Sequence, residues 1–600
     1  QPCSSAASDV YKRQLLDHNL IKGNSLVGVA SLNEIYEKFQ QGKGTLFEVN
    51  ADYLLGEAAK PLMELAKMSD ASIKDIENAR ILMKDARQKT LTTKALCDLI
   101  TAQPISTNAT LKGYLFENWD LQKDDVLNST AFKISKDILS KINPVHFPVA
   151  FPEVFLGYSK GFNVILGNPP WEAIKVEEKK FWARYYPGIK SKSQREFEAE
   201  KVNLYSSRPD LLRLMHLEKN EQDQIRKIIL AGNYPGIGKG DPDLYKAFSW
   251  RFVNLISKKN GSLGIVMPRS AISANGSQEF RRYIAKNSES VDISLLRNSA
   301  KWVFDIDPRY TIALISISKK VYNFPGIFLK GPFISLEHFQ EGINKKYIPI
   351  KFDEIESWTE DCAFPLLPNP ESLDVLRQLK KSPFITADIS NDWFLKPRRE
   401  LDASLQKNLM DLESKNCPEG FWPVYKGASF DIWNSDTKEY YAWGDPKIIK
   451  PFLLSREVNR AEREGRNSNF RTIHAENPRI SFRLITRATD NRTMRASLIP
   501  PKCFQQHSVQ FIEFIRGDLY DQIYVLGFLS SIPLDWYSRK FVELNFTFNY
   551  FNSLPIPRLE RTHSLWSEVI KFSGRLAFED LRFKDWANNC LLYTSPSPRD

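Results

Sequence analysis

Helical periodicity marks two long stretches of the chain. Between about residues 51 and 102, apolar residues recur at three- and four-residue steps among charged ones, which is the pattern of a helix with one buried face. The stretch from Glu172 to Leu230 is also charged and helix-prone. We therefore expect a helical insert over about residues 46–145 and more helix after residue 172.

Apolar runs bounded by turn residues lie between these helical stretches. The strand-like segments are Leu15 to Val29, Phe147 to Leu166, Gly261 to Pro268 and Tyr310 to Ile317. The run from Asp241 to Phe248 opens a helix, so helix and strand alternate. This alternation predicts an α/β fold, with most of one sheet and its crossover helices in residues 146–325. Ligands of such sheets bind beyond the carboxyl ends of the strands, where Asn168 and Pro268 lie.

Length and composition limit the kinds of protein to which this chain can belong. A chain of 600 residues has room for roughly three to four domains. The formal net charge of +11 modestly favours a polyanionic partner. No apolar run approaches the ~20 residues that cross a bilayer, so we expect a soluble protein with no membrane partner. The six cysteines are scattered without a C-x-x-C pair, which predicts no metal site, no disulfide framework and a reducing cytoplasm.

The turn after the segment Gly161–Gly167 carries the candidate chemistry. There an apolar strand stops at Asn168-Pro169-Pro170-Trp171. The prolines fix φ and remove backbone donors, so the Asn168 side-chain oxygen and the carbonyl after the first proline can converge on one amino group. By accepting its N–H bonds they favour a nucleophilic nitrogen, such as N6 of adenine, without a strong base. Trp171 offers a face to an extruded base. A plain strand-ending turn is the alternative.

Other short segments surround this turn in a fixed order. They are GNSL (residues 23–26), FPEVF (151–155), DLYKAF (243–248) and GSLGIVMPRS (261–270). With GNPPW, this order resembles the methylase region of bifunctional type IIG restriction-modification enzymes and related phage-defence (BREX-like) methyltransferases. Their catalytic fold is that of the TaqI-like γ-class adenine-N6 DNA methyltransferases. The resemblance covers about residues 15–560. It implies an S-adenosylmethionine-dependent (Rossmann-like) methyltransferase sheet, truncated at its N-terminal side, and a C-terminal α+β target-recognition domain.

The resemblance also implies a division of the chain. Both ends look like translated sequencing-adapter read-through, so we expect them to be non-native and the chain to be an internal fragment. The expected parts are non-native ends at 1–14 and 591–600, a remnant of the cofactor-binding half at 15–45, the helical insert at 46–145, the catalytic half at 146–325, a connector at 326–400, the target-recognition domain at 401–560 and a C-terminal helix at 561–590.

Roles for individual residues follow from the same resemblance. Asn168, Pro169, Pro170 and Trp171 match the catalytic motif. Gly23, Asn24, Ser25, Asp243 and Tyr245 match positions beside S-adenosylmethionine. Phe304 or Tyr310 matches the aromatic residue that stacks on the flipped base, and the sequence does not choose between them. One departure is serious, because the family's Gly-rich turn for the methionine part of the cofactor and the acid for its ribose precede GNSL, and neither is present. We therefore expect weak cofactor binding or none from this polypeptide.

Basic residues gather near the C-terminal end. The segment from Arg479 to Lys502 contains six basic residues and a single acidic one, Asp490. Strict alternation from residue 479 to 484 predicts a core face and an exposed basic face. The expected DNA-contacting residues are Arg479, Arg483, Arg487, Asn491, Arg492, Arg495 and Lys502. A solvated charged edge is the alternative, but PRISFR followed by NRTMRASLIPP resembles the target-recognition region of the same enzymes.

These observations predict a site-specific DNA adenine-N6 methyltransferase of a restriction-modification or phage-defence system. Its expected partner is double-stranded DNA, with other restriction or defence subunits as further candidates. No nuclease motif with its acids in the required order is visible. Two other readings stay open: methylation of RNA or of protein glutamine, and a non-catalytic DNA-recognition or scaffold subunit.

Overall fold

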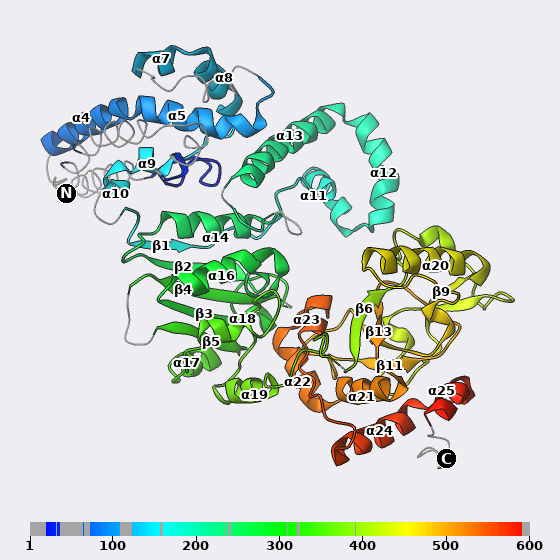
Figure 1. Cartoon of the computed structure of the whole chain (residues 1–600). Coiled ribbons are helices and arrows are strands. Elements are labelled where there is room, and N and C mark those ends of the chain that lie inside the picture. The colour runs from blue at the N-terminus through cyan, green and yellow to red at the C-terminus, as the bar shows by residue number, and fades with distance from the viewer. Residues whose placement is uncertain are drawn as a thin grey trace. The chain divides into compact units, whose positions relative to one another are not determined.

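The computed structural model describes residues 20–31, 33–35, 60, 64, 73–108, 123–156, 160–232, 234–237, 242–308, 310–320, 325–390 and 392–590. The chain divides into two compact units. The first comprises Gln1–Phe328, Phe333–Asn344 and Pro349–Phe352, and the second comprises Leu329–Pro332, Lys345–Ile348 and Asp353–Asp600. Both contain helices and strands, as Figure 1 shows, so the predicted α/β class is confirmed.

The first unit begins with helices. They are α4 (Ile73–Lys89), α5 (Leu91–Ala102), α7 (Lys123–Asn128) and α8 (Thr130–Leu139). Ser129 starts α8, because its side chain accepts the N–H of Phe132 and replaces a missing helical partner. The predicted helix is confirmed for α5, but ten of its twelve residues are buried, including Leu96 and Leu99, so it is covered on more than the one face that the spacing of apolar residues predicted.

Two segments predicted as strands have another structure. Residues 20–31 form turns, with one parallel bridge between Asn24 and Pro144. The segment after residue 146 forms two short helices, α9 (Phe147–Ala150) and α10 (Pro152–Phe155), so the strand prediction is wrong there. Each helix has a proline in its first turn, where the backbone N–H needs no helical partner. Residues 15–19 lie outside the described residues.

The charged stretch after the candidate turn is helical, as predicted. It forms α11 (Glu178–Ala183), α12 (Gln194–Ser207) and α13 (Pro209–Ala231). A capping box between Ser193 and Glu196 starts α12. Buried residues of all three helices, including Phe181, Trp182 and Phe197, form one hydrophobic cluster.

A five-stranded sheet follows in the order β1-β2-β4-β3-β5. Its strands are β1 (Val164–Gly167), β2 (Ser262–Pro268), β3 (Ser290–Arg297), β4 (Thr311–Ser318) and β5 (Gly326–Phe333). β1 and β2 are parallel, whereas β4 runs antiparallel to both β2 and β3. The start of β4 therefore lies at the same end of the sheet as the carboxyl ends of β1 and β2. The predicted strands at residues 261–268 and 310–317 are confirmed.

Helices α14 (Leu244–Leu255), α15 (Ser270–Ser273) and α16 (Gln278–Asn287) pack on this sheet (Figure 1). Gly167 is required beneath α14, because a Cβ at this position would lie 2.6 Å from the ring of Phe252. On β1 itself, Val164 and Leu166 are 62% and 79% exposed. β1 is thus an exposed edge strand, not the buried strand that its apolar sequence predicts.

The second unit holds two four-stranded sheets, in the orders β11-β10-β13-β6 and β12-β8-β9-β7. The strands are β6 (Phe394–Arg399), β7 (Met410–Asp411), β8 (Trp422–Tyr425), β9 (Tyr440–Gly444), β10 (Arg479–Arg483), β11 (Ala496–Ile499), β12 (Phe504–Gln505) and β13 (Val509–Arg516). β6 belongs to the segment expected as a connector, yet it forms an edge strand of the first of these sheets.

The remaining helices lie before, between and after these strands in the sequence. They are α17 (Leu336–Ile343), α18 (Phe352–Glu356), α19 (Glu371–Leu379), α20 (Pro446–Arg463), α21 (Leu519–Leu529), α22 (Ile532–Phe541), α23 (Phe548–Asn552), α24 (Ser564–Ala577) and α25 (Lys584–Asn589). The segment expected as a C-terminal helix therefore contains α24 and α25.

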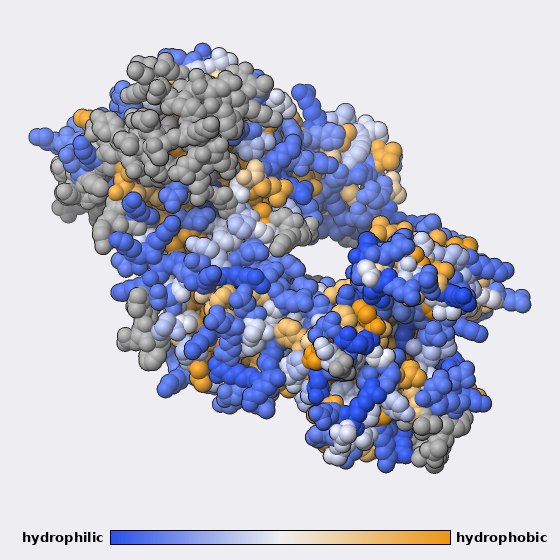
Figure 2. All heavy atoms as spheres, viewed as in Figure 1, coloured by the Kyte–Doolittle hydropathy of each residue, from blue (hydrophilic) through white to orange (hydrophobic). Residues whose placement is uncertain are grey.

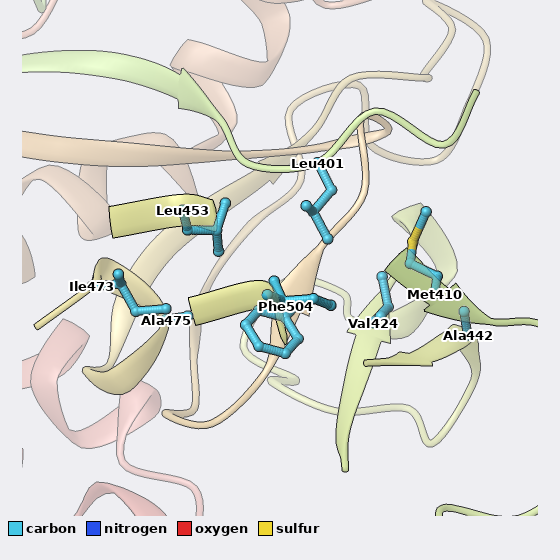
Figure 3. Close-up of a cluster of buried hydrophobic side chains, with 9 residues drawn as sticks. Leu401, Met410, Val424, Ala442, Leu453, Ile473, Ala475 and Phe504 are labelled. Atoms are coloured by element: carbon cyan, nitrogen blue, oxygen red, sulfur yellow. The ribbon is translucent and has the colours of Figure 1, made fainter. Parts of the chain in front are cut away.

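One hydrophobic cluster of the second unit joins residues from far-apart parts of the sequence. Figure 3 shows Leu401, Leu453 and Phe504 among its members. They come from the segment after β6, from α20 and from β12. Burial of these side chains stabilises this part of the unit, at about 1.5–3 kcal/mol for each large aliphatic or aromatic residue.

Hydrophilic residues cover most of the face that Figure 2 shows, with hydrophobic ones scattered among them. Within the described residues, no helix combines the length and apolarity needed to span a bilayer. The described cysteines, Cys97, Cys362, Cys417, Cys503 and Cys590, are free thiols. Among the described residues, no group of histidine, cysteine, aspartate or glutamate side chains could hold a metal ion.

Candidate functional site

The Asn-Pro-Pro-Trp turn lies at the carboxyl end of β1 and is open to solvent. Asn168 and Pro170 are exposed, Pro169 is buried and Trp171 is partly buried. No hydrogen bond ties the Asn168 side-chain amide to any described residue, so its oxygen can accept from a ligand. The turn is therefore not shut inside the core.

Backbone hydrogen bonds fix the turn against the start of α14. The Leu244 N–H donates to the Glu172 carbonyl at 2.8 Å, and the Ile174 N–H donates to the Pro242 carbonyl at 3.0 Å. Asp243, the N-cap residue of α14, bridges to Ala173. The segment Asp243–Tyr245 therefore lies next to the turn.

The antiparallel strand β4 brings Tyr310 to the same place. The residues Pro268 and Ile312 are paired, so Tyr310, which precedes β4, lies at the carboxyl ends of β1 and β2. The ring centroids of Trp171 and Tyr310 are 6.5 Å apart with an interplanar angle of 52°. Tyr310 is 50% exposed. An accessible aromatic ring therefore lies beside the predicted catalytic turn.

Phe304 has a different environment. It packs, together with Trp171, against the cluster of Leu296, Ile312 and Phe333. Because its ring contributes to this cluster, it is less available to a base than Tyr310. The structure brings both candidate aromatics to the turn and leaves Tyr310 the more accessible.

A cavity of about 570 Å³ lies beside Asn168 on one face of the sheet. Its lining comes from all four strands β1 to β4: Leu166, Gly167, Asn168, Gly264, Ile265, Val266, Asp292, Ser294, Leu314, Ile315 and Ser316. Ligand pockets typically enclose about 300–1,000 Å³ and combine apolar walls with a few polar groups. This depression is open to solvent rather than enclosed, and its volume falls within that range.

Asn298 is a residue of this site that sequence reasoning missed. It follows β3 and is fully buried. Its Oδ1 accepts the N–H groups of Val303 and Phe304, and its Nδ2 donates to the Phe304 carbonyl. Its backbone N–H donates to the Tyr310 carbonyl at 3.1 Å. A lone asparagine after an apolar run gives no signal of these contacts, which depend on the path of the loop.

Four of the predicted cofactor residues have structural contacts instead. Asn24 uses Oδ1 to accept the N–H of Leu26 at 3.1 Å, and its backbone pairs with residues 143 and 145. A Cβ on Gly23 would lie 2.6 Å from Val145. The side chain of Asp243 pairs with Lys246 at 2.9 Å. Tyr245 is 2% exposed, and burial raises the pKa of its hydroxyl.

A buried polar network holds the GNSL segment in place. His146 Nδ1 accepts the Val29 N–H at 3.2 Å, while its Nε2 lies 2.9 Å from Asp98 Oδ1. Burial lowers the pKa of His146, so the ring is neutral at pH 7. From α14, Arg251 Nη2 donates to the Leu26 carbonyl at 2.7 Å. These bonds fasten residues 26–29 to α14 and, through His146, to α5 of the helical insert.

Ser25 is partly buried, and within the described residues no hydrogen bond joins residues 23–25 to the Asn168 turn. Asn24 and Asp243 already make contacts within the protein, whereas the buried hydroxyl of Tyr245 has no hydrogen-bond partner. The assignment of these residues to S-adenosylmethionine stays a prediction.

Arg479 was predicted to face DNA, and this prediction is wrong. It is 4% exposed, and its Nη2 lies 3.1 Å from Glu400 Oε2 and donates to the Cys503 carbonyl. β10 is an inner strand between β11 and β13 with both faces covered, so strict alternation does not expose one of them. Arg479 has a structural role.

Three further basic residues of this region are tied to neighbouring groups. Arg483 and Arg495 both pair with Asp431, at 3.5 Å and 3.0 Å. Arg492 Nη2 donates to the Ser530 carbonyl at 2.7 Å. Burial lowers the pKa of Arg483. These three side chains are partly buried and are less free for phosphate than their sequence suggests.

Arg487, Asn491 and Lys502 are exposed, as predicted for a DNA-contacting surface. The first two lie on the segment of residues 486–495, which we call the recognition loop. Two residues of α22 hold this loop: Asp535 Oδ1 accepts the N–H of Thr493 at 2.7 Å, and Arg539 donates to the carbonyls of Ala488 and Asn491. No pattern in the sequence indicated this support.

Solved structures of several restriction enzymes are similar to the chain. The type IIL restriction-modification enzyme MmeI in complex with DNA is 11% identical, with a TM-score of 0.37, 94% of this chain covered and 71% of that one. The type IIG restriction endonuclease BpuSI is 14% identical, with a TM-score of 0.25 and the same coverage.

The type ISP enzyme LlaGI, as a nuclease-deletion mutant with a DNA substrate mimic, is 11% identical, with a TM-score of 0.36, 87% of this chain covered and 58% of that one. No protein-family model and no curated protein matches the chain. With TM-scores below 0.5, these likenesses do not establish a shared overall fold.

Proposed function

We propose that the chain is the base-receiving and DNA-recognition part of a site-specific DNA adenine-N6 methyltransferase of a restriction-modification or phage-defence system. One observation carries the proposal. The Asn168-Pro169-Pro170-Trp171 turn is open at the carboxyl end of β1, and the exposed ring of Tyr310 lies 6.5 Å from that of Trp171.

Adenine N6 is a poor nucleophile, because its lone pair is delocalised into the ring. The Asn168 side-chain oxygen and the Pro169 carbonyl can accept its two N–H bonds, which returns electron density to the nitrogen. The prolines hold these acceptors in a fixed geometry. An extruded base loses stacking worth a few kcal/mol, and an aromatic ring such as Tyr310 restores about 1–3 kcal/mol of it.

The recognition loop of the second unit supports the DNA part of the proposal. Its exposed Arg487 and Asn491 are residue types that contact phosphate and base edges. The loop is rigid, because Asp535 and Arg539 fix its backbone at several points. A preformed loop loses less conformational entropy on binding than a free one.

A second candidate function is favoured by the contacts of the GNSL and DLY segments. Asn24 and Asp243 already pair within the protein, which makes these two side chains less available to S-adenosylmethionine. A DNA-recognition subunit whose partner binds the methyl donor agrees with this observation. Titration of the chain with S-adenosylmethionine separates the two: micromolar binding supports an enzyme complete in itself, and no binding supports the subunit.

The catalytic role is tested with Asn168→Ala in a protein that carries a complete cofactor site. We expect transfer of a tritiated methyl group to duplex DNA to fall at least roughly a hundredfold, about 2.7 kcal/mol of lost stabilisation. Duplex binding should stay unchanged. Asn163→Ala is the matched control, since Asn163 is exposed at the start of the same strand. Unaltered transfer in the Asn168 variant removes that side chain from the mechanism. Preference for structured RNA over duplex DNA contradicts the assigned substrate.

A further inference from the structure

The loop between β3 and β4 is organised around one buried side chain. Asn298 Oδ1 accepts the N–H groups of Val303 at 3.2 Å and Phe304 at 3.1 Å. Its Nδ2 donates to the carbonyls of Phe304 at 2.9 Å and Ile306 at 3.5 Å. The side-chain amide thus uses both its acceptor and its donor capacity within one loop.

The backbone of Asn298 ties down the two ends of the same loop. Its N–H donates to the Tyr310 carbonyl at 3.1 Å, and its carbonyl accepts the N–H of Lys301 at 2.9 Å. Trp302 adds a bond from Nε1 to the Arg297 carbonyl at 2.7 Å. The residue is fully buried, so water does not compete for these bonds.

The loop adopts a conformation that needs such support. Ala300 and Lys301 have φ values of +58° and +57°, which side-chain-bearing residues rarely adopt. Neither is a glycine, so the backbone is strained at two consecutive positions. The hydrogen bonds to Asn298 offset this strain and select one path for the chain.

The selected path places aromatic rings at the candidate turn. Phe304 packs with Trp171 in one hydrophobic cluster, and Tyr310 lies 6.5 Å from Trp171. Both aromatic residues accept a hydrogen bond from Asn298 through their carbonyls. The side-chain amide of Asn298 therefore acts on Phe304 through its carbonyl, and the backbone N–H of Asn298 acts on Tyr310 in the same way. Neither group touches Asn168 or the cavity lining.

We infer that Asn298 is a positioning residue for the target base: it fixes residues 299–308 and 310 so that Tyr310 presents its ring beside Trp171. The claim that Asn298 serves a target base rests on the proposed function. The claim that Asn298 organises the loop rests on the hydrogen bonds alone. An amide is required, because aspartate keeps the size and the acceptor but places a negative oxygen against the Phe304 and Ile306 carbonyls.

The test compares Asn298→Asp with Asn287→Asp. Asn287 is the matched control, because it is exposed on α16 and its Nδ2 also donates to a backbone carbonyl, that of Tyr283, at 2.9 Å. Backbone amide exchange is followed by mass spectrometry. We expect exchange in residues 299–310 to rise at least about tenfold in Asn298→Asp, with other peptides and the control unchanged.

A second readout measures the position of the base. The probe is a duplex with 2-aminopurine opposite an abasic site, since an unpaired base is the cheapest to extrude. We expect Asn298→Asp to bind this duplex with the affinity of the original chain, but to lose at least about two thirds of the fluorescence change on binding. If Asn298 were needed only for folding, the affinity and the fluorescence change would fall together.

The outcomes separate the two hypotheses. Unchanged exchange in residues 299–310, or exchange raised throughout the unit, overturns the role of Asn298. If the original chain binds the probe without any fluorescence response, the proposed base-receiving function fails, and the exchange result still decides whether Asn298 organises the loop. Should Asn298→Asp not fold, Asn298→Ala removes the amide donors without adding charge and carries the same expectations.

Discussion

The ring of Tyr310 lies 6.5 Å from the ring of Trp171, centroid to centroid. The two residues belong to distant parts of the sequence and meet because β4 runs antiparallel to β2. A strand that entered the sheet in the other direction would start at the opposite end, away from the Asn168 turn. The pairing of these rings is thus a consequence of sheet topology.

Replacement of Tyr310 tests whether its ring receives a base. We expect Tyr310→Ala to reduce the preference for a duplex with an unpaired 2-aminopurine over a fully paired duplex by about 5- to 100-fold, which corresponds to the loss of one stacked ring. Tyr310→Phe should keep the preference. Fluorescence anisotropy gives both affinities. Tyr185→Ala, at another exposed tyrosine of the first unit, serves as the control, and an equal loss there would refute a specific role.

Arg487 provides a test of the recognition loop. Its side chain is exposed and forms no ion pair with any described residue. We expect Arg487→Ala to weaken duplex binding and to reduce the slope of log K against log salt by about 1, as for one lost phosphate contact. Binding titrations at several salt concentrations measure this slope. Arg471→Ala, an exposed arginine outside the loop, should leave the slope unchanged.

The buried pair of Arg479 and Glu400 makes a stability prediction. Arg479→Ala leaves Glu400 buried without its cation, which typically costs about 3–5 kcal/mol. Urea denaturation should therefore show a large loss in the free energy of unfolding of the second unit. The salt dependence of DNA binding by the folded fraction should not change. If Arg479→Ala had normal stability and a smaller slope of log K against log salt, Arg479 would be a DNA-contacting residue.

Lys380 predicts a pH dependence. Burial lowers the pKa of its ammonium group from 10.5 to about 7. Its Nζ lies 4.1 Å from the ring centroid of Phe384 and donates to the Ser553 carbonyl. Below pH 7 Lys380 is protonated in the native state as well, so the native state bears the full free-energy cost of burying the ammonium charge. Between pH 7 and 10.5 only the unfolded state keeps the proton, so the free energy of unfolding rises with pH.

The variant Lys380→Met removes this titration. We expect it to be more stable than the original chain at pH 6, by up to a few kcal/mol at about 1.4 kcal/mol per pKa unit. The difference should shrink as the pH approaches 10. Chemical denaturation at pH 6, 8 and 9.5 measures it, with Lys381→Met as the neighbouring control. A difference that does not vary with pH would show that the native ammonium is not penalised by burial.

Local sequence determined the elements whose cause is local. The spacing of apolar residues produced α5, the capping box at Ser193 and Glu196 produced the start of α12, and the prolines after Asn168 produced the rigid turn. Strands β2 and β4 follow from apolar runs bounded by turn residues. The capping box and the turn involve residues close together in the chain. The two strands are visible as apolar runs, although their hydrogen bonds are made to strands distant in the sequence.

Tertiary structure alone decided features that depend on distant neighbours. Arg479 and Arg487 look alike in the sequence, yet one is buried against Glu400 and the other is exposed on a loop held by Asp535 and Arg539. Asn298 became a centre of the site because the loop after β3 closes around it. Burial and pairing depend on which strands become neighbours, and neighbours are set by packing of the whole unit rather than by any short run of residues.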